Sequence, residues 1–189
     1  MSLEFFSIYE NVLSAQTCEQ IIDRFENSTD KHPGLVGDGS QHGGYDKNIK
    51  QTTELILNNR PEWQDVMELL FKSLQNQLPV YLQKWAHALK VELEPEDIRI
   101  QKYEPGGFFD WHSDNVGGAL RRVITVIWYL NTVEEGGETE YVWQKARIKP
   151  VQGSLLLCPV GWTYFHRGAP PVSDNKYIII TQLNQKLGG

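Results

Sequence analysis

The sequence is poor in sulfur-containing side chains, with two cysteines and two methionines in 189 residues. Cys18 and Cys158 lie far apart in the chain, so at most one disulfide can form. We expect two reduced, packed thiols instead, which excludes a disulfide-rich scaffold and is typical of an intracellular protein.

Long apolar runs and an excess of positive charge are also missing. Residues 1–6 contain an early acid, Glu4, so we expect no signal peptide, and no stretch approaches the length of a transmembrane helix. The 18 Lys and Arg against 24 Asp and Glu give a net charge of −6. Because a nucleic-acid or membrane-surface binder needs a basic face, we expect neither as a partner, and we predict a cytoplasmic location.

The N-terminal half has helical patterns. A hydrophobic content of 40% in 189 residues is enough for a core, and we predict one domain over residues 1–189. Residues 1–90 are predicted to be mainly helical. Ser14 caps a first helix running to about Asn27, Pro61 starts a second, and a third helical piece follows Pro79. Their apolar stripes need a partner layer.

Two further segments complete the predicted organisation. Residues 30–48 are rich in glycine and predicted to form a long loop, which is a candidate lid. Residues 91–185 change to short β-rich runs separated by Gly, Pro, Asn and Asp, which indicates an antiparallel sandwich or barrel. We therefore predict an α+β fold in which N-terminal helices support a jelly roll, or double-stranded β-helix. The predicted strands are 97–103, 123–130, 139–143, 146–149, 153–158, 163–166 and 176–183.

The most informative motif is His112-Ser113-Asp114. In a strand, residues i and i+2 face the same side, so this imidazole and carboxylate can reach one metal ion. His166 is the only histidine after Asp114 and is the natural third ligand. Two histidines and one carboxylate leave one side of a metal open, as in non-haem Fe(II) oxygenases. Alternatively, His112 is an exposed strand residue, Asp114 opens a turn and His166 is an ordinary core histidine.

Several linked segments resemble the 2-oxoglutarate-dependent prolyl 4-hydroxylases. They are 103–114, 122–131, 135–139 and 150–154, followed by His166 and Lys176, and the order and spacing of the family are preserved over about residues 97–183. The resemblance implies hydroxylation of a prolyl residue in a peptide or protein, with succinate and CO2 as coproducts. It implies Fe(II), 2-oxoglutarate as cosubstrate and ascorbate as a further candidate cofactor. The implied catalytic residues and iron ligands are His112, Asp114 and His166.

The same resemblance implies a cosubstrate pocket. Lys176 stands where the family has the cation for the distal carboxylate of 2-oxoglutarate, and a buried lysine needs an anionic partner. Tyr103 and Tyr129 resemble the phenols that hydrogen-bond the cosubstrate carboxylates, and Thr139 resembles a threonine that borders the pocket.

Purely structural interpretations of these residues stay open. Lys176 follows the turn sequence Ser-Asp-Asn and could be a solvated hairpin lysine. Tyr103 and Tyr129 could serve only sheet packing. Thr125 is predicted to reflect no more than the β propensity of threonine.

Other functions also stay open. One is hydroxylation of a free amino acid or another small metabolite, because the same site serves several substrates in related families. Another is a jelly-roll protein that binds a metal without turnover. A metal-dependent hydrolase would need a general base near the metal-bound water, and no acid stands at an obvious position. The family pattern is altered at Glu104 and Arg167, which bears on substrate choice, and the sequence gives no oligomeric state.

Overall fold

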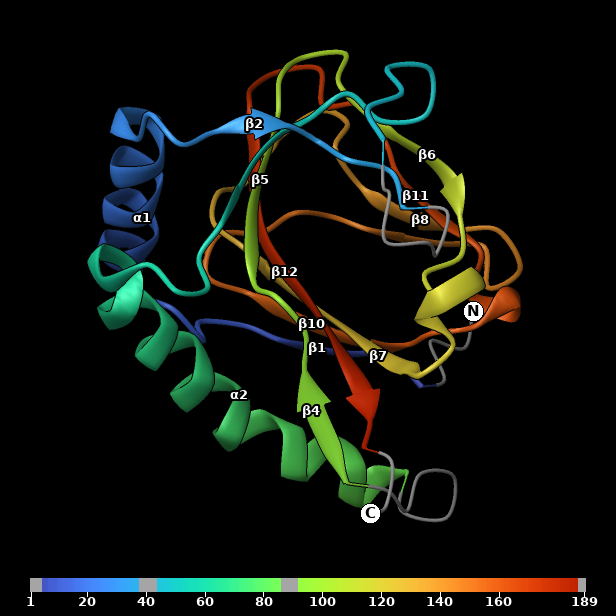
Figure 1. Cartoon of the computed structure of the whole chain (residues 1–189). Coiled ribbons are helices and arrows are strands. Elements are labelled where there is room, and N and C mark those ends of the chain that lie inside the picture. Colours follow the sequence, from blue (N-terminus) through green and yellow to red (C-terminus); the bar gives the residue numbers. More distant parts are fainter. Residues whose placement is uncertain (1–4, 38–43, 86–91, 187–189) are drawn as a thin grey trace.

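Two antiparallel sheets dominate the computed structural model, which describes residues 5–37, 44–85 and 92–186 (Figure 1). The large sheet has the strand order β1-β10-β7-β12-β5-β3-β2, with β4 also paired to β12, and the small sheet has the order β6-β11-β8-β9. The large-sheet strands are β1 (Ser7–Tyr9), β2 (His32–Pro33), β3 (Thr53–Ile56), β4 (Leu93–Pro95), β5 (Arg99–Tyr103), β7 (Arg122–Tyr129), β10 (Leu155–Pro159) and β12 (Lys176–Gln185). The small-sheet strands are β6 (Phe109–His112), β8 (Thr139–Tyr141), β9 (Ala146–Ile148) and β11 (His166–Gly168).

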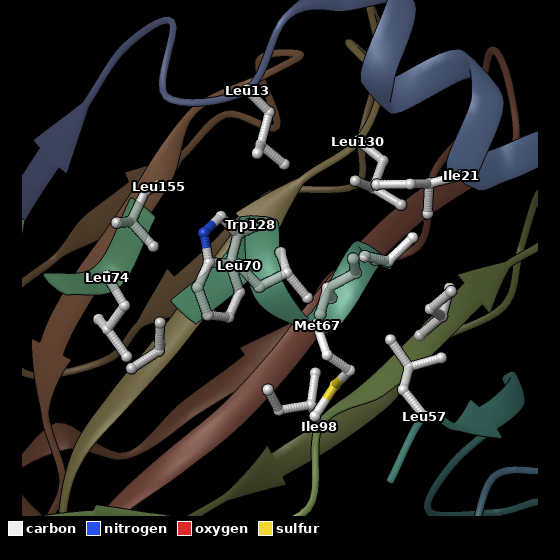
Figure 2. Close-up of a cluster of buried hydrophobic side chains, with 14 of the residues drawn as sticks. Leu13, Ile21, Leu57, Met67, Leu70, Leu74, Ile98, Trp128, Leu130 and Leu155 are labelled. Atoms are coloured by element: carbon white, nitrogen blue, oxygen red, sulfur yellow. The ribbon is translucent and has the colours of Figure 1, made fainter. Parts of the chain in front are cut away.

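The central strand β7 divides the core into two layers. Its residues alternate between faces, so Trp128 packs with the helices while Ile127 and Tyr129 pack toward the small sheet. Figure 2 shows Trp128 among Leu70 and Met67 of the second helix. Because the large sheet is covered on both faces, β7 is almost continuously buried. The arrangement of the two antiparallel sheets is jelly-roll-like.

The first predicted helix is confirmed. Helix α1 spans Ala15–Asn27, and the Ser14 side chain accepts a hydrogen bond from the Thr17 backbone N–H. That bond satisfies one of the free donors at the helix start. Ile21 and Phe25 are buried against the large sheet, which the helical spacing of the apolar residues predicted.

The prediction of separate second and third helices is wrong. After a 3₁₀ turn (Pro61–Trp63), helix α2 runs from Gln64 to Lys84 with Pro79 inside it. Proline removes one backbone donor, but burial of Leu74 before it and Tyr81 after it holds both segments against the same core. The Tyr81 hydroxyl also donates a 2.8 Å hydrogen bond to the Phe5 carbonyl. Tertiary contacts therefore outweigh the local preference of proline.

The predicted strand 163–166 is also wrong. Trp162–Tyr164 form a 3₁₀ turn, and the strand begins at His166, which pairs with β6 and β8. The short strands β2, β3 and β4 were not among the predicted runs, since they depend on pairing with other segments. Within the predicted loop 30–48, β2 is present, and residues 38–43 lie outside the described part.

Two expectations from the composition can be compared with the structure. Cys18 and Cys158 are both buried and free. None of the helices in the described segments has the length and apolar content needed to cross a bilayer.

A buried hydrogen bond between α2 and β7 leads to a stability prediction. The Trp128 indole N–H donates to the Ser73 hydroxyl at 2.9 Å, and both residues are buried. Ser73→Ala leaves the indole without that acceptor, so we expect the free energy of unfolding to fall by about 1–3 kcal/mol in urea denaturation. Ser7→Ala, on β1, is the control, because the Ser7 hydroxyl has no hydrogen-bond partner among the described residues, and it should change the free energy of unfolding by about 0.5 kcal/mol or less. Equal effects of the two substitutions would contradict the role of this bond.

Candidate metal centre

Three side chains, from β6, from the bend after it and from β11, converge at one point. His112 ends β6, and its register partner on β11 is His166. Asp114 lies in the bend after β6, so strand alternation does not place it, but its carboxylate still reaches both rings. His112 Nε2 is 3.4 Å from Asp114 Oδ1, and His166 Nε2 is 3.7 Å from Asp114 Oδ2. Nitrogen and oxygen atoms of the three residues all lie within 4.8 Å of one another, which is compatible with a shared metal ion.

Backbone carbonyls orient the two imidazoles. His112 Nδ1 is 2.7 Å from the Asp110 carbonyl oxygen, and His166 Nδ1 is 2.9 Å from the Tyr164 carbonyl oxygen. A carbonyl oxygen only accepts, so each Nδ1 carries the proton and donates it. The lone pair is then on Nε2 in both rings, directed at Asp114. This pattern of second hydrogen bonds is typical of histidines that bind metals.

The protonation states also suit a metal. Burial and the neighbouring His112 lower the pKa of His166 to about 4, although Asp114 opposes the shift, so the imidazole is neutral at pH 7. Burial alone would raise the pKa of Asp114, but the two histidines and the Thr125 hydroxyl hold it well below its usual range. A buried, ionised carboxylate beside the neutral His166 ring is an anion that a divalent cation can compensate.

Asp114 has two further supports that the sequence did not reveal. The Thr125 hydroxyl donates to Asp114 Oδ2 at 2.6 Å, so the prediction that Thr125 serves only β propensity is wrong. The Arg122 guanidinium donates to the Asp114 backbone oxygen at 3.0 Å and pairs with Glu96. Both contacts join β7 to the bend after β6, and the spacing of the motif gives no direct sign of them.

A cavity of about 670 Å³ extends from these three residues between the two sheets. Lys176, Tyr103 and Thr139 line it, and Tyr129 lies behind Thr139 with a 2.9 Å bond between their hydroxyl oxygens. The Tyr103 hydroxyl donates to Gln101 at 3.0 Å. The structure therefore brings the predicted pocket residues to the same cavity as the three converging side chains.

Lys176 is a buried cation in this cavity, with 1% of its surface exposed. Its ammonium nitrogen is 4.8 Å from the centre of the Tyr103 ring, and among the described residues it has no hydrogen-bond acceptor or ion-pair partner. Burial lowers its pKa to about 7, with Glu138 opposing the shift. The solvated-lysine interpretation is thus wrong, and an anionic ligand would remove the cost of burying the charge.

Comparisons with known proteins agree with this geometry. A family model described as the 2OG-Fe(II) oxygenase superfamily matches residues 98–183, which include all three converging side chains. The chain is 28% identical to prolyl 4-hydroxylase 5 of Arabidopsis thaliana over an alignment of 148 residues. This alignment covers 76% of this chain but only 47% of the plant protein. The chain thus spans about half the length of that relative.

Two solved structures share the fold. One is a viral collagen prolyl hydroxylase of Paramecium bursaria Chlorella virus-1 in a 2OG complex, with a TM-score of 0.66, 19% identity and coverage of 97% of this chain and 98% of the other. The second is a prolyl hydroxylase of Trichoplax adhaerens in complex with a hypoxia-inducible factor peptide fragment. Its TM-score is 0.79, with 16% identity and coverage of 97% of this chain and 84% of the other. At these identities the likeness concerns the fold.

The contact between Thr125 and Asp114 leads to a prediction on metal affinity. Thr125→Val keeps the shape but removes the donor that orients the carboxylate, so we expect divalent-metal affinity to fall about 10- to 100-fold in calorimetric titration with Mn(II). Thr125→Ser should keep most of the affinity. Thr181→Val is the matched control, because Thr181 is equally buried but its hydroxyl donates to the Glu96 carbonyl. An unchanged affinity in Thr125→Val would refute this role.

Proposed function

We propose that this chain, which belongs to the 2OG-Fe(II) oxygenase superfamily, hydroxylates a prolyl residue of a peptide or protein. It is an enzyme that uses Fe(II) and 2-oxoglutarate. The observation that supports the proposal most strongly is the presence, in one cavity, of the converging His112, Asp114 and His166 and of an unpaired lysine, Lys176.

In this proposal, His112, Asp114 and His166 hold Fe(II). Their donor set fits the ion, because both histidines present Nε2 and the carboxylate is ionised. When bound, Fe(II) and 2-oxoglutarate supply the oxidation of an unactivated C–H bond by O2, with succinate and CO2 as coproducts. The contribution of the protein is the fixed orientation of the ligands by the Asp110 and Tyr164 carbonyls.

Lys176 would bind the distal carboxylate of 2-oxoglutarate. Tyr103 is its register partner on β5 and lines the same end of the cavity. Ile178, two residues further along β12, faces the cavity and offers an apolar surface to the methylene groups of a diacid. Thr139, held by Tyr129, would border the bound cosubstrate. A role for ascorbate stays a prediction.

The prolyl substrate and the role of the helices rest on likeness to the relatives. The plant relative is named a prolyl 4-hydroxylase, and both solved structures are prolyl hydroxylases. We further propose that residues 1–189 form one domain in which α1 and α2 are the supporting layer of a double-stranded β-helix. Their shared core with the large sheet supports this arrangement.

The function is tested in two steps. Anaerobic addition of Fe(II) and 2-oxoglutarate should give a visible metal-to-ligand charge-transfer band. Aerobic incubation with a library of proline-containing peptides should then give the mass gain of one oxygen atom on proline, detected by mass spectrometry. His112→Ala and Asp114→Ala should lose both signals, and Asp23→Ala, at an exposed position on α1 outside the cavity lining, should keep both. A band with no modified proline would reject the substrate, whereas turnover in His112→Ala would reject the ligand set.

The pKa of Lys176 predicts a pH dependence. With the pKa lowered to about 7 in the empty pocket, part of the lysine is neutral at neutral pH, and a bound dianion favours the protonated form. Affinity for 2-oxoglutarate should therefore fall as the pH rises above 7, by up to about tenfold per pH unit. This fall in affinity ends when the pH reaches the pKa of Lys176 in the complex with 2-oxoglutarate, which is higher than its pKa in the empty pocket. Titration of the charge-transfer band between pH 6.5 and 9 measures it.

Two variants separate charge from position in this experiment. Lys176→Arg keeps its charge over that range, so its affinity should depend little on pH. Lys176→Ala should bind 2-oxoglutarate weakly at every pH, with a large rise in its Michaelis constant. A normal Michaelis constant in Lys176→Ala would place the anchor elsewhere.

A further inference from the structure

The charges around the cavity are unevenly compensated. Its lysine and arginine residues are Lys50, Arg99, Arg122 and Lys176. Lys50 forms a 2.5 Å ion pair with Glu54, and Arg122 pairs with Glu96 at 2.6 Å. Lys176 has its proposed partner in 2-oxoglutarate. Within the described ranges, Arg99 is then the remaining cation of the cavity without an ion-pair or hydrogen-bond partner.

Buried amides with free hydrogen-bonding groups accompany Arg99. Gln101 follows it on the same face of β5, and Gln182 lies on the neighbouring strand β12; both line the cavity. Gln101 is 3% exposed and uses its oxygen to accept from Tyr103, so its NH2 group is left to donate. Gln182 is 6% exposed, and its side chain has no hydrogen-bond partner in the described part of the chain. Both amides line the cavity, so their free N–H groups can donate to the oxygen atoms of a ligand there.

The polar wall formed by Arg99, Gln101 and Gln182 extends away from the cosubstrate end, which only Gln101 adjoins through its bond with Tyr103. The register partner of Lys176 on β5 is Tyr103, whereas that of Arg99 is Ile180, four residues further along β12. Four strand residues correspond to about 13 Å, so a five-carbon diacid held between the metal and Lys176 does not also reach Arg99. Gln182, by contrast, is the register partner of Thr125, whose hydroxyl bonds Asp114. The wall therefore begins beside the candidate metal centre.

We infer that Arg99, Gln101 and Gln182 form a second carboxylate site, which binds a carboxylate of the substrate next to the carbon that is hydroxylated. This inference rests on the proposed function and specifies its substrate class. A guanidinium with adjacent amide N–H donors matches a carboxylate in charge and geometry. The carboxylate is either the α-carboxylate of a free or C-terminal residue or the side chain of an Asp or Glu beside the target proline.

Two matched probe pairs distinguish these sources. N-acetyl-L-proline and N-acetyl-L-prolinamide differ only in the α-carboxylate, and capped peptides Gly-Pro-Glu-Gly and Gly-Pro-Gln-Gly differ only in the side chain. Each is titrated into the anaerobic Fe(II) and 2-oxoglutarate complex, and its dissociation constant is measured by calorimetry. We expect the acid of one pair to bind at least about tenfold more tightly than its amide, and that pair identifies the source.

The variants test the assignment of residues. Arg99→Gln should lose the acid-over-amide preference while its 2-oxoglutarate affinity stays within about twofold of the wild type. Lys176→Ala should show the reverse. Its affinity for 2-oxoglutarate should be weak, and its preference for the acid over the amide, measured at saturating 2-oxoglutarate, should be intact. Arg147→Gln removes an exposed charge on β9, outside the cavity lining, and should change neither.

The outcomes separate this inference from the proposed function. A wild type without the charge-transfer band refutes both. A normal band with equal binding of acid and amide, or with binding of none of the four probes, overturns the second carboxylate site alone. If Arg99→Gln weakens 2-oxoglutarate binding and keeps the preference, Arg99 belongs to the cosubstrate pocket and the inference is overturned as well.

Discussion

The structure of the site depends on the pairing of β6 with β11, which sets His166 directly opposite His112. That register brings together two imidazoles from segments far apart in the chain, and the carbonyls of Asp110 and Tyr164 then fix which nitrogen each ring presents. Asp114 enters between them from a bend, held by Thr125. Without the register the same three residues would be an exposed histidine, a turn aspartate and a core histidine.

The cavity that begins at these residues contains two buried charges. An anionic carboxylate, Asp114, is buried beside two imidazoles, and an ammonium, Lys176, is buried beside aromatic rings. Among the described residues, Lys176 has no ion-pair partner, and the groups within ion-pairing distance of Asp114 are His112 and the neutral His166. Two such uncompensated charges in one cavity are unfavourable in the free protein, and a divalent cation with a bound diacid compensates both. The stability cost and the ligand specificity thus have one physical origin.

The sequence was informative where the determinants are local or linked by spacing. The His-x-Asp motif, the single later histidine, the lysine after a turn and the cap at Ser14 are such cases. It was uninformative where a contact across strands decides. Thr125 fits a strand whether or not its hydroxyl meets Asp114, and Pro79 predicts a break that burial of Leu74 and Tyr81 overrides. Short strands such as β2 and β4 exist because a neighbour pairs with them.

One signal was present in the sequence but needed the structure to be interpreted. Arg99, Gln101 and Tyr103 alternate along β5, and such alternation ordinarily marks the solvent face of a strand. Here that face points into the cavity, while Ile100 packs toward the helices. A large sheet covered on both sides has no solvent face in its centre, so its inward polar residues meet either a neighbouring side chain, as Gln101 meets Tyr103, or a ligand in the cavity. The positions that contribute least to packing are therefore those where substrate choice can be encoded.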